Sequence, residues 1–172
     1  IMQEGDEVYG ENITLTPQPQ VSIVIEDQST GHVVAMVGGR GQKTASRTLN
    51  RATDAARQPG STFKIVSTYL PALDSAGLTL ADVHMDEPYS YEGGRPVSNW
   101  YSGYRGICSL RDGIRDSLNI IAVKTLTQIT PQLGFDYLQS LGFTTLVTDK
   151  VVGDEVYSDI QQSLALGGVT VG

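Results

Sequence analysis

A serine and a lysine one helical turn apart are the residues of this sequence best placed to do chemistry. Ser61 and Lys64 follow Pro59-Gly60, a pair that ends the preceding element and lets a helix begin. Side chains three positions apart share one face of a helix, so the Lys64 amine could take the proton of the Ser61 hydroxyl. The spacing predicts a nucleophile with its own base, beside unpaired N–H groups that could stabilise an oxyanion.

A second polar pair, Ser117 and Asn119, follows later in the chain. Of four lysines only Lys64 has a serine three positions before it, and of four asparagines only Asn119 has a serine two positions before it. The second pair is expected in the break between two helices, where both side chains can face the same side. Taken singly, Ser61, Ser117 and Asn119 could each be helix-capping residues, and Lys64 could be a solvated residue of a first turn.

The sequence around both motifs carries a family resemblance. It is similar to the transpeptidase domain of penicillin-binding proteins, in their class A, bifunctional branch, from about Gln20 to Gly172. The segments that carry the likeness are IEDQSTGHVVAMVGGR, RQPGSTFK, SNWYSGYRGICSLRDGIRDSLNIIAVK and LALGG.

The resemblance implies a fold and a set of roles. The fold is α+β (mixed α/β), part of the penicillin-binding protein and serine β-lactamase-like transpeptidase fold, with an antiparallel sheet packed against helices. Ser61 would attack the carbonyl of a D-Ala-D-Ala bond in a peptidoglycan stem peptide, or a β-lactam ring, with Lys64 as base. Ser117 would relay a proton, Asn119 would bind the substrate amide and hold Lys64, and Trp100 would line the cleft entrance. As a base, Lys64 needs a pKa lowered by burial or nearby positive charge from its ordinary value of about 10.4.

One family motif does not occur in this sequence. The third motif, Lys-Thr-Gly or Lys-Ser-Gly, lies in the family on a strand that supplies the second oxyanion N–H and holds the substrate carboxylate. We therefore expect residues 20–172 to be the N-terminal part of the transpeptidase domain, with the C-terminal strands missing and the remaining part of the domain as a partner. Residues 1–19 are expected to be a linker, too short for a glycosyltransferase domain.

Composition excludes several other functions. The net charge of -7 forms no basic stripe, which argues against binding to nucleic acid or to a membrane surface through a polybasic segment. No apolar run approaches the roughly 20 residues of a membrane span. The resemblance implies a parent protein tethered at the extracytoplasmic face of the bacterial cell membrane, with its anchor outside this chain. His32 and His84 have no metal-ligand spacing, and no phosphate-binding loop occurs, so no cofactor and no metal are expected. Cys108 is alone and is expected to be a packing residue.

The coarse element pattern places the motifs. Alternation predicts a β-hairpin from 21–26 and 32–37, followed by a loop to Asn50. A helix from Ser61 to about Ala76 is apolar all round, which predicts burial, and Pro71 predicts a bend within it. A long surface loop pinned by aromatic rings is expected over 83–107. Further helices are expected over 110–117, 119–129 and 131–140.

Three other functions compete with the transpeptidase. A β-lactamase would need a carboxylate that promotes deacylation. Glu155 follows Ser117 at a suitable distance in the sequence, but EVYSD lacks the Glu-x-x-Leu-Asn pattern of class A β-lactamases. A β-lactam sensor would keep the acylation site without a transfer reaction. An inert structural fragment is the third alternative, because the third motif is missing. Labelling with a fluorescent penicillin distinguishes an active site from an inert one.

Overall fold

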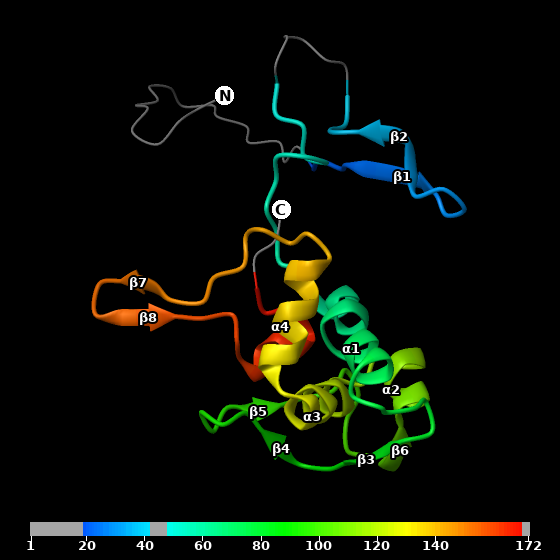
Figure 1. Cartoon of the computed structure of the whole chain (residues 1–172), viewed down its shortest axis with the longest axis vertical. Helices are drawn as coiled ribbons and strands as arrows, with labels where there is room; N and C mark the ends of the chain where they lie inside the picture. The colour runs from blue at the N-terminus through cyan, green and yellow to red at the C-terminus, as the bar shows by residue number, and fades with distance from the viewer. Residues whose placement is uncertain (1–18, 42–47, 170–172) are drawn as a thin grey trace, which may run out of the picture. The chain divides into compact units, whose positions relative to one another are not determined.

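A computed structural model describes residues 19–41 and 48–169 of the chain. The chain divides into two compact units, Ile1–Ala55 and Ala56–Gly172 (Figure 1). The linker expected over 1–19 lies almost wholly outside the described residues, as does much of the loop expected before Asn50.

The first unit contains the predicted hairpin. Strands β1 (Ile23–Asp27) and β2 (His32–Val37) pair antiparallel, with a bulge between Ile25 and Glu26. The turn is closed by the Asp27 carboxylate, which accepts hydrogen bonds from the N–H and hydroxyl of Ser29. Every residue of both strands is exposed, apolar ones included. A two-stranded hairpin without a packed face is marginal in water, so these strands are built to receive further structure.

The second unit is mainly helical, and its helices lie where the sequence predicts them. They are α1 (Leu70–Asp74), α2 (Leu110–Arg115), α3 (Asn119–Ile129) and α4 (Pro131–Ser140) (Figure 1). Ser109 and Asp112 form a capping box at the start of α2, and the Thr130 hydroxyl accepts from Leu133 N–H at the start of α4. These local signals explain why the helix boundaries were predictable.

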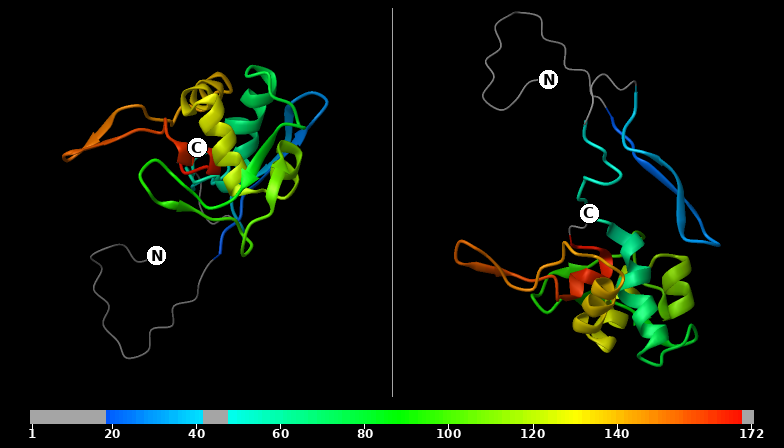
Figure 2. Two further views of the ribbon diagram at one scale, coloured as in Figure 1. Left: turned by 90° about the horizontal axis from the view of Figure 1, so that it is seen from below. Right: turned by 45° about the horizontal axis from the view of Figure 1, so that its top comes forward.

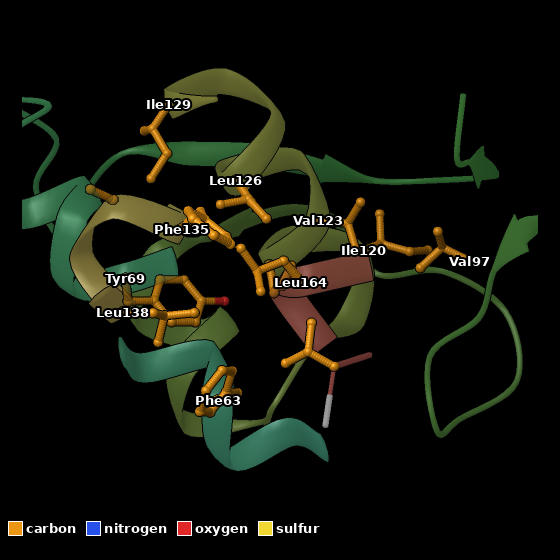
Figure 3. Close-up of a cluster of buried hydrophobic side chains, with 14 of the residues drawn as sticks. Phe63, Tyr69, Val97, Ile120, Val123, Leu126, Ile129, Phe135, Leu138 and Leu164 are labelled. Atoms are coloured by element: carbon orange, nitrogen blue, oxygen red, sulfur yellow. The ribbon is translucent and has the colours of Figure 1, made fainter. Parts of the chain in front are cut away.

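Helix α3 runs through the hydrophobic core of the second unit. Its Val123 and Leu126 lie among Tyr69, Phe135 and Leu164, side chains that come from three other elements (Figure 3). Helix α4 packs closely because it carries Gly134: a Cβ at this position would lie 2.4 Å from the Ser67 carbonyl oxygen. The core thus fixes α3, whose first residue is Asn119, against the segment that follows Ser61.

The Ser61 segment is helical but irregular. It consists of a 3-10 turn, η1 (Gly60–Thr62), a π-helical turn, η2 (Ile65–Tyr69), and then α1. Pro71 has no N–H to donate, and the wide π turn directly before it is the irregularity that the sequence predicts as a bend. The prediction that this segment is buried on all sides was wrong, because Ile65 is 48% exposed and Leu70 and Leu73 also face solvent.

The expectation of a long surface loop over 83–107 missed four short strands. Strand β3 (Val83–Asp86) pairs antiparallel with β6 (Gly106–Ser109), and β4 (Tyr89–Ser90) pairs with β5 (Pro96–Val97). These strands are two to four residues long, too short to produce a readable alternation. Cys108 is buried on β6, as expected of a packing residue.

The last part of the second unit adds a hairpin and a 3-10 helix. Strands β7 (Lys150–Val152) and β8 (Glu155–Tyr157) form a hairpin that extends away from the helices in both views of Figure 2. Helix η3 (Gln162–Leu166) then returns to the core, where Leu164 is fully buried. The segment LALGG therefore packs inside the second unit.

Candidate active site

Lys64 is a buried lysine held by the second motif. Lys64 is only 2% exposed to solvent. Its Nζ donates to the Ser117 carbonyl oxygen at 2.7 Å, to Ser117 Oγ at 2.8 Å and to Asn119 Oδ1 at 2.6 Å. The structure thus brings Lys64, Ser117 and Asn119 together from two distant parts of the sequence. A solvated first-turn lysine is excluded by this burial.

Burial also changes the acidity of this lysine. Loss of hydration disfavours the ammonium and lowers the pKa of Lys64 from 10.5 to about 8. No carboxylate is among its three hydrogen-bond partners, so no ion pair in the described residues opposes the effect. A pKa near 8 leaves a usable fraction of neutral amine at physiological pH, which the role of general base requires.

Ser61 lies in the middle of η1 and is exposed to solvent. The spacing predicts a direct hydrogen bond from Ser61 to Lys64, and the described part of the chain contains none. The reason is visible at Nζ: an ammonium has three N–H donors, and three oxygen atoms of Ser117 and Asn119 already accept them. Lys64 and the second motif are therefore preassembled, while Ser61, three residues before Lys64, is open to solvent.

Ser117 has an unusual backbone conformation. Its φ of 52° is in the left-handed region, one of two such non-glycine residues in the described chain. A serine in this region costs about 1–3 kcal/mol, so the surrounding structure must hold it there. The conformation turns both the carbonyl and the hydroxyl of Ser117 toward Lys64 Nζ. Strain at this position therefore serves the site.

Asp116, the residue before Ser117, is held from several directions. Its carboxylate accepts from Arg115 Nε at 2.8 Å and from Arg105 Nη1 at 2.6 Å. These bonds, with that from Arg115 the larger effect, hold the pKa of Asp116 well below its usual range. Asp116 is thus a fixed anion next to the strained serine.

Trp100 lies beside the second motif. Trp100 is 70% exposed, and its ring packs edge-on against Tyr101. Its Nε1 donates to the Asp116 carbonyl oxygen at 2.9 Å. The structure therefore places Trp100 next to Ser117 with an open ring face. Its expected contact with substrate stays a prediction.

Helix η3 supports the turn that carries Ser61. Gly167 has a φ of 66°, and a Cβ there would lie 2.3 Å from the Gly60 carbonyl oxygen and 2.6 Å from its nitrogen. Nearby, Ser67 Oγ donates to the Leu164 carbonyl oxygen at 3.2 Å. Only glycine allows this approach, so the LALGG segment sets the backbone directly before Ser61.

Two residues that sequence reasoning missed complete the surroundings of the second motif. Asn99 accepts from the backbone N–H of Asn119 at 2.8 Å, and the buried Asp86 accepts from Asn99 Nδ2 at 2.8 Å. The signal available in the sequence was an aspartate at the end of an otherwise uncharged strand and an asparagine directly before Trp100. Neither position suggests a partner until β3, β6 and α3 are assembled.

Other groups stand apart from this site. Glu155 lies exposed on β8, where its carboxylate accepts from the Tyr157 hydroxyl, and it contacts no motif residue in the described chain. A cavity of about 580 Å³ is lined by residues that include Tyr91, Arg95 and Gln162, but by none of the four motif residues. The described residues contain no cluster of metal-ligating side chains. In the described ranges, no helix has the length and apolar character needed to cross a bilayer.

Comparison with known proteins agrees with this geometry. The profile of the family "Penicillin binding protein transpeptidase domain" matches residues 21–167. Penicillin-binding protein 1A of Streptococcus pneumoniae is 37% identical over 126 residues, which are 72% of this chain and 18% of that protein. Penicillin-binding protein 1F of Bacillus subtilis is 34% identical over 172 residues, all of this chain and 21% of that protein. The chain thus spans about a fifth of the length of these curated relatives.

Solved structures show the same likeness. A crystal structure of penicillin-binding protein 1A from Haemophilus influenzae matches with a TM-score of 0.66 and 29% identity, over 88% of this chain and 21% of that one. The penicillin-binding protein PonA1 from Mycobacterium tuberculosis, at 20% identity, shares the fold with a TM-score of 0.68 over 88% of this chain and 38% of that one. The predicted mixed α/β fold is confirmed by these neighbours. The chain belongs to the penicillin-binding protein transpeptidase domain family, in its class A branch.

Proposed function

We propose that this chain forms the acylation half of a serine D,D-transpeptidase that cross-links peptidoglycan stem peptides and is inactivated by β-lactams. Ser61 Oγ bonds to the carbonyl carbon of the D-Ala-D-Ala peptide bond, and the terminal D-Ala leaves as an amine. The Ser61 proton passes to neutral Lys64 and through Ser117 to that amine. A second stem-peptide amine then attacks the ester, which forms the cross-link and restores Ser61. In a β-lactam the ring amide is cleaved in the same way, but its nitrogen stays attached to the acyl group.

The observation that carries this proposal is the environment of Lys64. Lys64 is 2% exposed, its pKa is lowered to about 8, and Ser117 and Asn119 hold its Nζ. Such a lysine is suited to remove the hydroxyl proton of Ser61, which lies one turn away. Perturbed titratable groups gather at catalytic sites because their chemistry requires it. A purely structural lysine would be expected to keep a carboxylate partner or to reach solvent.

The three contacts of Lys64 also suggest how it becomes a base. Of the three oxygen atoms around Nζ, only Ser117 Oγ carries a hydrogen, so only this contact can reverse its direction. When Lys64 loses a proton, it keeps donating to the Ser117 carbonyl and Asn119 Oδ1, and its lone pair accepts from a hydroxyl. Ser117 is therefore suited to relay the proton between Lys64 and the leaving amine.

The partners and location follow from the same proposal. The substrates are stem peptides ending in D-Ala-D-Ala, and the site would act at the extracytoplasmic face of the bacterial cell membrane, in cell-wall synthesis. The solvent-exposed strands β1 and β2 support a further partner, the rest of the transpeptidase domain with its Lys-Thr-Gly or Lys-Ser-Gly strand. Trp100 would contact the substrate at the cleft entrance.

Labelling with a fluorescent penicillin tests the proposal in the protein at its full natural length. The wild type should gain a covalent label that peptide mass spectrometry places on Ser61, and Ser61→Ala should gain none. Ser140→Ala is the matched control, because Ser140 is exposed at the end of α4, donates to the Tyr137 carbonyl oxygen rather than to a motif residue, and should leave labelling like that of the wild type. A label on another residue, or none on the folded wild type, would refute the proposal. Transfer of a D-Ala-D-Ala analogue to an amine acceptor then separates a transpeptidase from a sensor.

A further inference from the structure

A buried carboxylate lies outside the four motif residues. Asp86, at the end of β3, is 1% exposed and accepts hydrogen bonds from Asn99 Nδ2 at 2.8 Å, from Arg105 N–H at 2.8 Å and from the Tyr101 hydroxyl. Among the described residues it makes no ion pair. A buried charge without an ion pair is costly, and three aimed donors are what make it tolerable. The arrangement therefore calls for a purpose beyond packing.

Asn99 connects this carboxylate to helix α3. Its Nδ2 donates to Asp86 Oδ1 and to the Tyr101 oxygen, both at 2.8 Å, while its Oδ1 accepts from the N–H of Asn119 at 2.8 Å and of Ile120 at 3.3 Å. A flipped amide would set its NH₂ against two N–H groups and its oxygen against a carboxylate, so Asp86 fixes its orientation.

This amide takes the place of a missing helix cap. The residue before α3 is Leu118, which offers no side-chain cap, and the first N–H groups of a helix need acceptors from elsewhere. Asn99 supplies one from a distant segment. Its neighbour Ser98 contributes a carbonyl oxygen that accepts from Asn119 Nδ2 at 2.7 Å. Both the backbone and the side chain of Asn119 are thus held by the segment 98–99.

The same stretch of chain also holds the other side of Ser117. Trp100 Nε1 donates to the Asp116 carbonyl oxygen, and Arg105 Nη1 donates to the Asp116 carboxylate. Segment 98–105 therefore contacts the residue before Ser117 and the residues after it. These bonds hold the chain on both sides of Ser117, whose φ of 52° is left-handed.

We propose that Asp86 and Asn99 are positioning residues for acyl transfer, which hold Asn119 and the strained Ser117 at hydrogen-bond distance from Lys64. The inference rests on the proposed function, because acylation of Ser61 is what it predicts to change. Asp86 touches neither Lys64 nor Ser117 in the described structure; it acts through Asn99 and α3. Without it, the Asn119 and Ser117 oxygen atoms would no longer be fixed around Nζ.

A reversed pair gives a sharp test in the protein at its full natural length. Asn99→Asp sets two carboxylates against each other and removes the donor to Asp86. Asp86→Asn leaves one acceptor oxygen where the carboxylate has two, so the new amide can accept from Asn99 Nδ2 or from Arg105 N–H, but its NH₂ then faces the other donor. The double variant Asp86→Asn with Asn99→Asp restores the hydrogen bond between the two positions with the polarity reversed, and leaves an acceptor facing the start of α3. Each single variant should lower the maximal acylation rate by a fluorescent penicillin about 10- to 100-fold, with the affinity of the first encounter little changed. The double variant should recover to within about threefold of wild type.

Controls separate positioning from mere stability. Glu87→Gln removes the neighbouring carboxylate, which is partly exposed and pairs with Lys124, and should leave acylation unchanged. Tyr101→Phe, a milder change for use where a single variant does not fold, should lower the rate about two- to fivefold. Thermal melts correct each rate for the folded fraction.

Three results overturn the inference in distinguishable ways. If wild type is labelled at Ser61 and the folded single variants or Tyr101→Phe react at the wild-type rate, Asp86 and Asn99 only stabilise the fold. If the double variant stays as slow as the singles, the hydrogen bond between them is not what matters. If folded wild type is not labelled at all, the proposed function fails and the positioning role fails with it.

Discussion

Acylation of Ser61 should accelerate as the pH rises through the pKa of Lys64. Only the neutral amine can accept the serine proton, and burial lowers the pKa of Lys64 to about 8. At pH 7 about one molecule in eleven carries neutral Lys64, and at pH 9 about ten in eleven do. The acylation rate should therefore rise about tenfold between pH 7 and pH 9 and then level off.

The assay is the second-order rate of labelling by a fluorescent penicillin, measured from pH 6.5 to about pH 10 on the protein at its full natural length. Lys64→Arg should abolish labelling, because a guanidinium stays protonated over this range. Lys150→Met is the matched control: Lys150 is exposed on β7, and its removal should leave the pH profile intact. A flat profile, or a midpoint near 10.5, would refute the assignment of Lys64 as the base.

The same pKa shift gives an independent check through stability. Between pH 8 and about 10.5 the unfolded chain binds a proton at Lys64 that the folded chain has released, so the free energy of unfolding should rise with pH across this window. The full gain is roughly 3 kcal/mol. It should be absent in Lys64→Met, as measured by urea unfolding at pH 7.5 and at about pH 10.

Two further predictions concern close contacts in the second unit. The Tyr69 hydroxyl is buried without a hydrogen-bond partner in the described chain, so Tyr69→Phe should leave the free energy of unfolding unchanged or raise it by about 1 kcal/mol. In Gly113→Ala the new Cβ would lie 2.5 Å from that hydroxyl, so this variant should be less stable than the wild type. Adding Tyr69→Phe to Gly113→Ala should restore part of the lost stability. Gly134→Ala should lower the free energy of unfolding by about 1–3 kcal/mol, because its Cβ would clash with the Ser67 carbonyl. Gly93 is exposed and has open space around it, so Gly93→Ala should not lower the free energy of unfolding. Equal melting temperatures for the two variants would contradict this packing.

Local signals in the sequence were enough to predict the helices and the first hairpin. Ser109 with Asp112, and Thr130 with Pro131, mark helix starts that need no tertiary information. The π turn at Ile65–Tyr69 could be predicted only as a bend, because the sequence shows that Pro71 breaks a hydrogen bond but not how the chain adapts. Short strands such as β3 and β6 escaped prediction because their pairing joins segments about twenty residues apart and their alternation is too brief.

The candidate site was predictable in composition but not in geometry. Spacing paired Ser61 with Lys64 and Ser117 with Asn119, and the family resemblance implied that the two pairs form one site. The structure places Lys64, Ser117 and Asn119 in contact. Spacing could not show that Ser117 and Asn119 occupy every donor of Lys64 in place of Ser61, since that depends on the left-handed turn at Ser117. Nor could it single out Asn99, whose partners lie on β3 and α3.

The approach of Gly167 to Gly60 has a consequence for the order in which the site assembles. The two glycines lie near opposite ends of the second unit, so the backbone before Ser61 reaches its final position only after nearly all of that unit has formed. Contacts between distant parts of a chain form late, because a long loop must close first. During synthesis the ribosome would release Ser61 well before the LALGG segment that contacts the turn before it. A nascent chain that ends before LALGG would therefore carry Ser61 without the contact that fixes the backbone directly before it.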